Sequence, residues 1–131
     1  MASRKIEDLH PDVIQKYHSF MQGCKEQGID VIITCTYRSC EEQTLLYAQG
    51  RTVAGKIVTN AKTGESKHNN TINGKPASKA FDIVPIVNGK CIWDSKHPIW
   101  QELGKIGRRC GLEWAGDWKG SLVEYPHFQI K

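Results

Sequence analysis

The sequence predicts an α+β fold, in which helices pack on one face of a small, mainly antiparallel sheet. Three observations lead to this class. Two long segments place an apolar residue at every third or fourth position, which is the spacing of an amphipathic helix. Other segments are short and rich in β-branched residues, as buried strands are. Tight-turn signals, of the kind that join antiparallel neighbours, accompany some of these strand segments.

The N-terminal third supplies two predicted helices and one strand. The first helix spans residues 11–27 and carries one apolar stripe that ends before a glycine. Residues 31–37 are mostly β-branched and predict a buried strand. Ser39 and Glu42 have the spacing of a capping box, which predicts a second helix ending at Gly50. The stripe of the first helix consists of Val13, Tyr17, Phe20 and Cys24.

The middle of the chain is irregular before it returns to strand. Residues 51–80 are dominated by Gly, Asn, Thr, Ser and Lys and have no sustained period, which is typical of a functional or mobile loop. Within this loop, Asn73-Gly74 predicts a two-residue hairpin turn. Residues 80–87 predict a strand, and a tight turn at 87–90 leads into residues 91–93.

The C-terminal third supplies the last helix and a final strand. The helix is expected to begin near Pro98 and to stop at Gly111. Residues 126–130 are expected to pair into the sheet as a strand. No internal repeat or domain boundary is visible, so residues 1–131 are expected to form one domain. The apolar stripe of this helix consists of Ile99, Leu103, Ile106 and Cys110.

Composition excludes several classes of protein. With 39% hydrophobic and 24% charged residues, neither a disordered nor a membrane protein is favoured, and no apolar run approaches the ~20 residues of a membrane span. The formal charge of +4 is mild and the basic residues are dispersed, so nucleic-acid binding is only a weak alternative. The first residues lack an apolar signal region, so we expect synthesis in the cytosol without a Sec signal.

The cysteines indicate a reducing compartment. Their number is odd and no CxxC pair occurs, which argues against a disulfide framework. We expect thiols that are mostly buried, with Cys35 and Cys40 as alternative metal ligands. The five are Cys24, Cys35, Cys40, Cys91 and Cys110.

Two histidines and one aspartate have the composition of a catalytic zinc site. His68 lies in the polar loop, whereas Asp82 and His127 lie in predicted apolar strands, where a carboxylate is costly unless it is paired or bound to a metal. Three protein ligands leave a fourth position for water, which distinguishes a catalytic zinc from a structural one. Glu124, three residues before His127, is placed to act on that water. Taken singly, each of the four has an ordinary surface interpretation; together they predict a small zinc hydrolase.

Several short strings follow one another in a characteristic order. They are Thr36-Tyr37-Arg38-Ser39, Glu42-Gln43, Leu46-Tyr47-Ala48-Gln49-Gly50-Arg51-Thr52, Ser66-Lys67-His68, Ala80-Phe81-Asp82, Trp114-Ala115-Gly116-Asp117-Trp118 and Glu124-Tyr125-Pro126-His127-Phe128. In this order, over about residues 30–130, they resemble the D-alanyl-D-alanine carboxypeptidase-like zinc peptidases, the VanY and hedgehog-like group. The resemblance is strongest to phage endolysins that are L-alanyl-D-glutamate peptidases. The family pattern is S-x-H-x-x-G-x-A-x-D followed by a late acidic-x-x-His.

The resemblance implies a role for each matching residue. His68, Asp82 and His127 would hold Zn²⁺, and Glu124 would take the proton of the water and return it to the leaving amine. Arg38 would hold a substrate carboxylate or the developing oxyanion; its alternative is a surface arginine ahead of a capped helix. The implied substrate-binding residues are Gln43, Ser66 and Trp118, although Ser66 could instead only shape the loop before His68.

One departure from the family pattern concerns spacing. The family places its Asp seven residues after the first His, whereas His68 and Asp82 are fourteen apart, and Ser78 stands at the pattern's Gly. The extra residues, about 70–77, contain the predicted turn, so a longer hairpin could keep both ligands in place. Asp94 and Asp117 are the alternative ligands.

The tryptophans have two possible uses. Trp93, Trp114 and Trp118 could line a substrate groove, whereas Trp100 adjoins a helix stripe and is expected in the core. Packing is the default role of all four, because aromatic residues supply much of the core of a small domain.

The resemblance implies a peptidoglycan endopeptidase that cuts between L-Ala and D-Glu of the stem peptide. Such an endolysin would be a monomer without a separate wall-binding domain, would not insert into the membrane, and would wait in the host cytoplasm until a holin gives it access to the wall. A D,D-carboxypeptidase or dipeptidase on the same scaffold is the second enzyme hypothesis. A zinc-containing binding module without turnover is the alternative from another class, although such a module would have no reason to keep Glu124.

Overall fold

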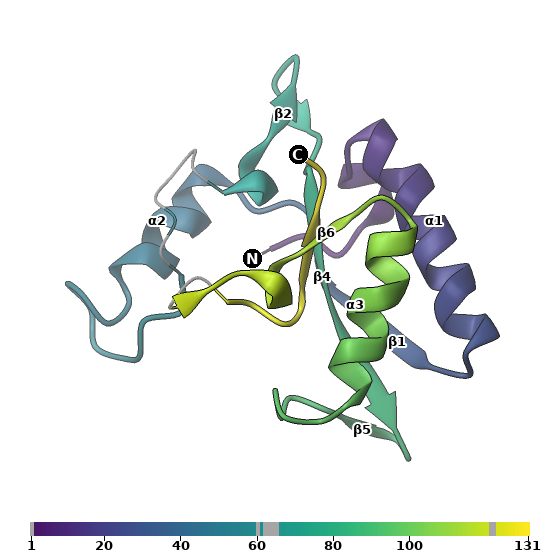
Figure 1. Ribbon diagram of the computed structural model, residues 1–131. Coiled ribbons are helices and arrows are strands. Elements are labelled where there is room, and N and C mark those ends of the chain that lie inside the picture. Colours follow the sequence, from purple (N-terminus) through teal and green to yellow (C-terminus); the bar gives the residue numbers. More distant parts are fainter. Residues whose placement is uncertain (1, 60, 62–65, 121–122) are drawn as a thin grey trace.

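The structure is a computed structural model that describes residues 2–59, 61, 66–120 and 123–131. Figure 1 shows its elements in chain order. The helices are α1 (Pro11–Glu26), α2 (Cys40–Ala48) and α3 (Ile99–Arg109), with 3-10 turns η1 (Ile6–Asp8), η2 (Lys67–Asn69) and η3 (Ala115–Asp117). The strands are β1 (Asp30–Cys35), β2 (Thr71–Ile72), β3 (Lys75–Pro76), β4 (Ala80–Val87), β5 (Lys90–Cys91), β6 (Glu113–Trp114) and β7 (His127–Gln129).

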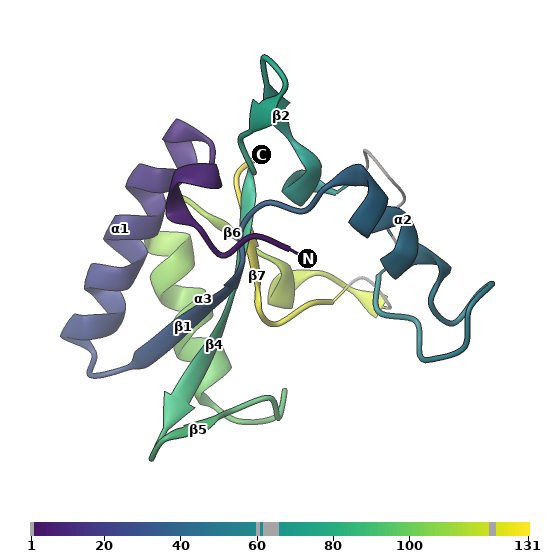
Figure 2. The same ribbon diagram turned by 180° about the vertical axis from the view of Figure 1, so that it is seen from behind.

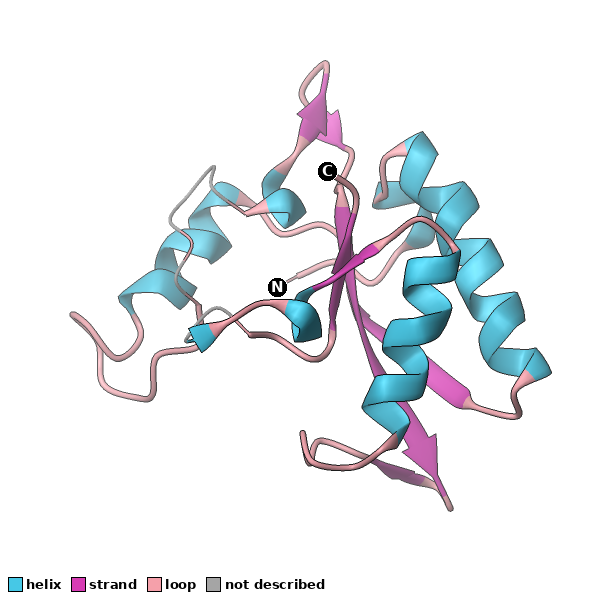
Figure 3. Cartoon of the chain, viewed as in Figure 1, coloured by secondary structure: helices cyan, strands magenta, loops and turns pink. Residues whose placement is uncertain are grey.

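The main sheet is antiparallel at every pairing of its described strands. Its order is β1-β4-β7-β6, and β5 pairs with the far end of β4, while β2 and β3 form a separate hairpin. The helices α1 and α3 lie together on one side of the sheet, and α2 lies on the other side (Figures 1 and 3). The view from behind shows the same division (Figure 2). The site described below occupies the side of α2.

Alternation along the strands separates a core face from a polar face. Phe81, Phe128 and Trp114 are direct partners across β4, β7 and β6, and all three are buried. Their rings stack, with centroids 5.8 Å apart for Phe81 and Phe128 and 6.4 Å apart for Trp114 and Phe128. The residues next to them, Asp82 and His127, are also direct partners and point to the opposite face, because successive side chains alternate. The sheet therefore carries an aromatic row on one face and polar groups on the other.

Two glycines of α3 let this helix lie against the aromatic row. A Cβ on Gly104 would overlap the indole of Trp114, and one on Gly107 would overlap the ring of Phe128. On the same side of the sheet, Phe20 of α1 packs on Phe81 and Phe128, with ring centroids 5.7 and 4.8 Å away. This packing fixes the strands that carry the polar residues.

Most of the predicted elements are confirmed. The fold class is α+β with a mainly antiparallel sheet, the strand over residues 80–87 is confirmed at both ends, and the capping box of Ser39 and Glu42 is present. The strand predicted to reach residue 37 ends at Cys35, and the segment 91–93 contributes only Cys91 to β5. The strand β6 was not predicted from the sequence. Part of the predicted loop, at residues 60 and 62–65, lies outside the described residues.

The predicted hairpin is present and has the expected turn. Asn73 and Gly74 both have positive φ, 53° and 76°, as an Asn-Gly turn between antiparallel strands requires. Among the described residues, no helix has the length and apolar character needed to cross a membrane.

Candidate active site

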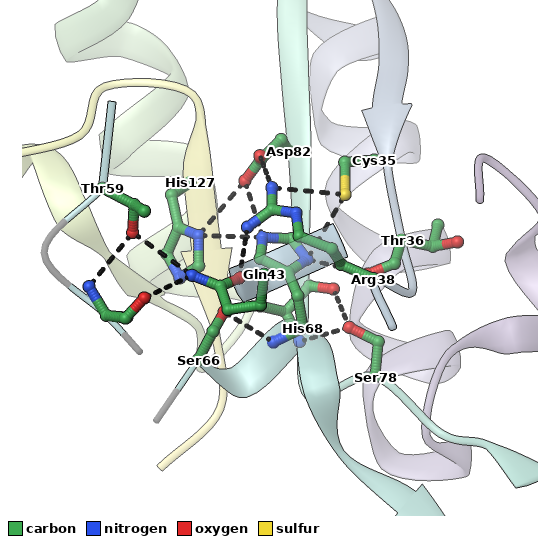
Figure 4. Close-up of polar contacts among 12 residues, drawn as sticks. Cys35, Thr36, Arg38, Gln43, Thr59, Ser66, His68, Ser78, Asp82 and His127 are labelled. Atoms are coloured by element: carbon green, nitrogen blue, oxygen red, sulfur yellow. Dashed lines mark hydrogen bonds and ion pairs between the residues drawn. The ribbon is translucent and has the colours of Figure 1, made fainter. Parts of the chain in front are cut away.

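Three side chains from separate elements converge on the polar face of the sheet (Figure 4). His68 comes from η2, Asp82 from β4 and His127 from β7. The Nε2 atom of His68 lies 3.1 Å from Oδ1 of Asp82 and 3.2 Å from Nδ1 of His127, and the last two atoms are 3.1 Å apart. Ligand atoms around a tetrahedral zinc, with bonds of ~2.0–2.1 Å, are about 3.3 Å apart. The three atoms therefore form a triangle of the size that zinc requires.

The hydrogen bonds of His68 leave the nitrogen in the triangle free to bind a metal. Its Nδ1 lies 2.7 Å from the backbone oxygen of Thr36, which can only accept, so Nδ1 carries the proton and donates. Nε2 then has its lone pair toward Asp82 and His127. An outer hydrogen bond of this kind fixes the tautomer of metal-binding histidines generally.

His127 is oriented in the same way through its other nitrogen. Its Nε2 lies 2.8 Å from Oε1 of Gln129, two residues along the same strand and on the same face. The amide oxygen accepts the Nε2 proton, which leaves the lone pair of Nδ1 directed at the triangle. Neither Thr36 nor Gln129 was found by the sequence analysis. The contact of Thr36 is made by its backbone, and that of Gln129 depends on its place in β7.

Electrostatics at the triangle favour a cation. Burial alone would lower the pKa of His68, but the charge of Asp82 and its hydrogen bond outweigh burial and raise that pKa to about 10. Burial alone would raise the pKa of Asp82, but His68 and His127 hold it well below its usual range. The buried carboxylate thus draws positive charge to the imidazole nitrogens, and a metal ion can replace the proton there.

Cys35 lies beside the triangle but is a poorer third ligand than His127. Its sulfur is 3.6 Å from Nδ1 of His68, and Cys35, His68 and Asp82 also form a group that could bind a metal. That nitrogen, however, already donates to Thr36, whereas the triangle with His127 uses Nε2. Cys40 is exposed on α2 and is not a member of this group.

The expectation that the thiols are mostly buried is wrong. Cys24 and Cys35 are buried, Cys110 is partly buried, and Cys40 and Cys91 are exposed. The sequence could not settle this point, because exposure of Cys40 and Cys91 depends on the faces that α2 and β5 present to solvent.

The hairpin explains the wide spacing of His68 and Asp82. The backbone N–H of Ala77 donates to the oxygen of Asn70 over 3.0 Å, and the Asn70 side chain donates to Ala77 over 2.8 Å. The next pair inward is held by a 2.9 Å bond from Lys79 to the oxygen of Lys67. The chain therefore leaves and returns at one place, and the intervening residues project away from the triangle.

Arg38 lies beside Asp82 and is held by Gln43. The Nη2 atom of Arg38 is 3.9 Å from Oδ2 of Asp82, and Nη1 donates to Oε1 of Gln43 over 2.9 Å. Gln43 is completely buried, and its amide nitrogen donates to the oxygen of Ala61 over 2.6 Å. In the structure the buried side chain of Gln43 contacts Arg38, and its predicted contact with substrate stays a prediction.

A cleft of about 790 Å³ opens over the triangle, a size typical of ligand sites. The predicted residues Ser66, Trp118 and Glu124 line it together with Arg38 and the two histidines. Ser66 also accepts a hydrogen bond from the backbone of His68 over 3.2 Å, so it shapes the loop as well. The ring of Trp118 lies 5.6 Å from that of His127, between centroids.

Glu124 meets the cleft from the segment before β7. The residue keeps contact with solvent, but desolvation of its carboxyl raises its pKa above the usual range, and His127 and Asp82 act on that pKa in opposite directions. A carboxylate that shares a cleft with the triangle is placed to exchange protons with a water bound there.

The remaining candidates lie elsewhere. The alternative ligand Asp117 is exposed and pairs with Arg108, whose Nη1 is 2.8 Å from its Oδ2, and Asp94 accepts from the backbone of Lys96. Trp100 and Trp114 are buried in the core, so Trp100 is confirmed there and Trp114 does not line the cleft. Trp93 is 60% exposed and is not part of the cleft lining.

An α+β fold with two imidazoles and a carboxylate beneath an open cleft defines a hydrolytic metallopeptidase. The chain belongs to the VanY family, since the family's sequence profile, described as D-alanyl-D-alanine carboxypeptidase, matches residues 6–114. The chain is 39% identical to the peptidoglycan L-alanyl-D-glutamate endopeptidase CwlK of Bacillus subtilis, over 94% of this chain and 74% of that protein.

Solved structures share the fold. The L-Ala D-Glu endopeptidase ChiX of Serratia marcescens superposes with a TM-score of 0.67 at 18% sequence identity. The match covers 100% of this chain and 89% of the ChiX chain. The LD-carboxypeptidase LdcB gives a TM-score of 0.66 at 16% identity, over 93% of this chain and 58% of its own. At these identities the likeness concerns the fold alone.

Proposed function

We propose that this protein is a zinc-dependent peptidoglycan endopeptidase that hydrolyses the bond between L-Ala and D-Glu of the stem peptide. The observation that carries the proposal is the triangle of His68, Asp82 and His127 beneath the cleft. Support for the scissile bond comes from the relative CwlK, a peptidoglycan L-alanyl-D-glutamate endopeptidase. Phage origin, a role in host lysis, access through a holin and a monomeric state stay predictions.

The donor set suits zinc. Two neutral imidazoles and one carboxylate are ordinary ligands of catalytic zinc, and the tautomers set by Thr36 and Gln129 aim both lone pairs at one point. A zinc ion held there would supply Lewis-acid polarisation of the carbonyl and a water nucleophile at neutral pH.

The chain's own residues would carry the proton and the charge. Glu124 would accept a proton from the attacking water as its oxygen adds to the L-Ala carbonyl carbon. Glu124 would then deliver that proton to the D-Glu nitrogen as the C–N bond breaks, which leaves an L-Ala carboxyl group, still carrying the second proton of the water, and a free D-Glu amine. Arg38, held by Gln43 beside the triangle, would stabilise the developing oxyanion.

Product analysis tests the proposal. Purified peptidoglycan is digested with the zinc-loaded protein, with and without a chelator, and the fragments are identified by mass spectrometry. We expect chelator-sensitive release of peptides with a new N-terminal D-Glu. Loss of a terminal D-Ala alone would instead establish a carboxypeptidase. Absence of any cleavage by zinc-loaded protein would favour the binding module.

A further inference from the structure

We propose that Glu113 is a positioning residue for the metal ligand His127 and acts through the amide of Gln129. The proposal rests on the zinc site described above and extends it outward by two residues. Glu113 lies on β6 and Gln129 on β7, where they are direct partners across the two strands. Neither residue is assigned a role by its place in the sequence.

The three residues form a continuous chain of hydrogen bonds on the polar face of the sheet. Oε2 of Glu113 accepts from Nε2 of Gln129 over 3.3 Å, and Oε1 of Gln129 lies 2.8 Å from Nε2 of His127. Gln129 is 9% exposed and His127 is 6% exposed, so water has little access to replace a broken link.

The direction of every hydrogen in this chain follows from Glu113. A carboxylate can only accept, so the amide of Gln129 must turn its NH₂ group toward Glu113. Its oxygen then faces His127, and that oxygen requires a proton on Nε2 of the imidazole. The Nδ1 lone pair is left for the metal. For His68 the same task is done by a backbone carbonyl, which no side-chain substitution removes.

Glu113 also binds Trp118, a residue that lines the cleft. Its second oxygen, Oε1, accepts from the indole Nε1 of Trp118 over 3.0 Å. Both carboxylate oxygens of Glu113 therefore accept a hydrogen bond, one from Gln129, which contacts the metal ligand, and one from the cleft-lining Trp118. An amide in place of the carboxylate has one acceptor oxygen and an NH₂ group, so it cannot offer an acceptor atom at both of the positions that the two donors face.

Because the amide lacks the second acceptor atom, Glu113→Gln is an informative variant. Either Trp118 or Gln129 would face an NH₂ group, and a flip of the Gln129 amide would put a donor against His127. We expect zinc affinity, measured by competition with a chelating dye, to fall about 10- to 100-fold, which is typical of lost outer hydrogen bonds at metal sites. The matched control is Glu102→Gln, which makes the same chemical change at an exposed position of α3, away from these hydrogen bonds.

A double variant tests the hydrogen directions directly. In Glu113→Gln/Gln129→Glu the new amide can accept from Trp118 and donate to the new carboxylate, whose other oxygen can accept from His127. We expect each single variant to bind zinc weakly. The zinc affinity of the double variant should be at least tenfold higher than that of Glu113→Gln. Long-range ¹⁵N–¹H spectra of the zinc-loaded wild-type protein should show the proton of His127 on Nε2, a readout that needs no variant to fold.

The outcomes separate this proposal from the proposed function. Wild-type protein that binds no zinc would remove the zinc site itself. Wild-type protein that binds zinc, with Glu113→Gln at the affinity of the control, would overturn the role of Glu113. A His127 proton found on Nδ1 in the zinc-loaded wild type, or a double variant no better than Glu113→Gln, would overturn it equally.

Discussion

Asp82 and His127 are direct partners across β4 and β7, and Oδ1 of the aspartate lies 3.1 Å from Nδ1 of the histidine. Two of the three proposed ligands are thus fixed by strand pairing alone, and the third, His68, arrives on a short turn. Strands are stiffer supports than loops, so this pair defines the position of the site. The arrangement leads to five predictions.

The first prediction concerns Asp82. Asp82→Asn keeps the volume and removes the charge, and we expect zinc affinity to fall more than about 100-fold, since even outer partners of metal ligands are worth 10- to 100-fold. Zinc content after dialysis and chelator competition measure this. Asp94→Asn and Asp117→Asn are the controls and should bind zinc as the wild type does. A fully active Asp82→Ala variant would remove Asp82 from the ligand set.

The second prediction separates metal binding from proton transfer. Glu124→Gln should keep zinc affinity within about threefold and lower kcat by about 10²- to 10⁴-fold, the usual contribution of a general base. Zinc content, circular dichroism and the rate of stem-peptide cleavage are measured on the same preparation, beside Glu102→Gln. Retained turnover would exclude Glu124 from that role.

The third prediction concerns removal of the metal. The aromatic core lies on the opposite face of the sheet from the triangle, so we expect the chelated protein to stay folded while losing activity. Zinc should raise the free energy of unfolding by about 2.7 kcal/mol at a free concentration 100 times Kd. Thermal unfolding at several zinc concentrations measures this, and loss of the near-ultraviolet spectrum on chelation would contradict it.

The fourth prediction concerns the hairpin between His68 and Asp82. Hydrogen bonds between Asn70 and Ala77 close its base, so replacing residues 71–76 with Asn-Gly should leave a shorter two-residue turn on the same base. We expect zinc affinity within about threefold of the wild type. A variant that folds but has lost the metal would show that the hairpin supports the site. Its activity on intact peptidoglycan reports separately on contact with the wall polymer.

The fifth prediction concerns the glycine contact beneath the sheet. Gly104→Ala would drive a methyl group into the ring of Trp114, and overpacking of this kind costs about 1–3 kcal/mol. Denaturant unfolding should show this loss, whereas Gln101→Ala, an exposed change on the same helix, should cost less than about 0.5 kcal/mol. Equal stability of the two variants would contradict the close approach of helix and sheet.

The sequence was sufficient wherever the signal is local. The apolar stripe of α1, the capping box at Ser39 and the turn at Asn73 depend on neighbours a few residues away. The convergence of His68, Asp82 and His127 was anticipated from residue types and from a family resemblance. Neither source contains the distances between the atoms.

The features that were not predicted from the sequence depend on contacts between distant segments. The strand β6 is only two residues long and exists because Trp114 pairs with Phe128. Glu113 and Gln129 look like ordinary polar residues in the sequence, and only the pairing of β6 and β7 connects them to His127. Gln43 was predicted to contact substrate because it falls in a matching string, whereas its burial and its hydrogen bond with Arg38 depend on the fold and were not predicted.

The alternation of side chains along β7 restricts how such a chain can change over evolutionary time. A shift of β7 by one residue in its pairing register would turn Phe128 toward the cleft and His127 toward α3, exchanging site and core in one step. Residues added to the hairpin at 71–76 do not shift the register of the sheet, because the hydrogen bonds at its base keep residues 70 and 77 together whatever its length. Relatives should therefore vary in length between the first histidine and the aspartate, and hardly at all within the three residues of the last strand.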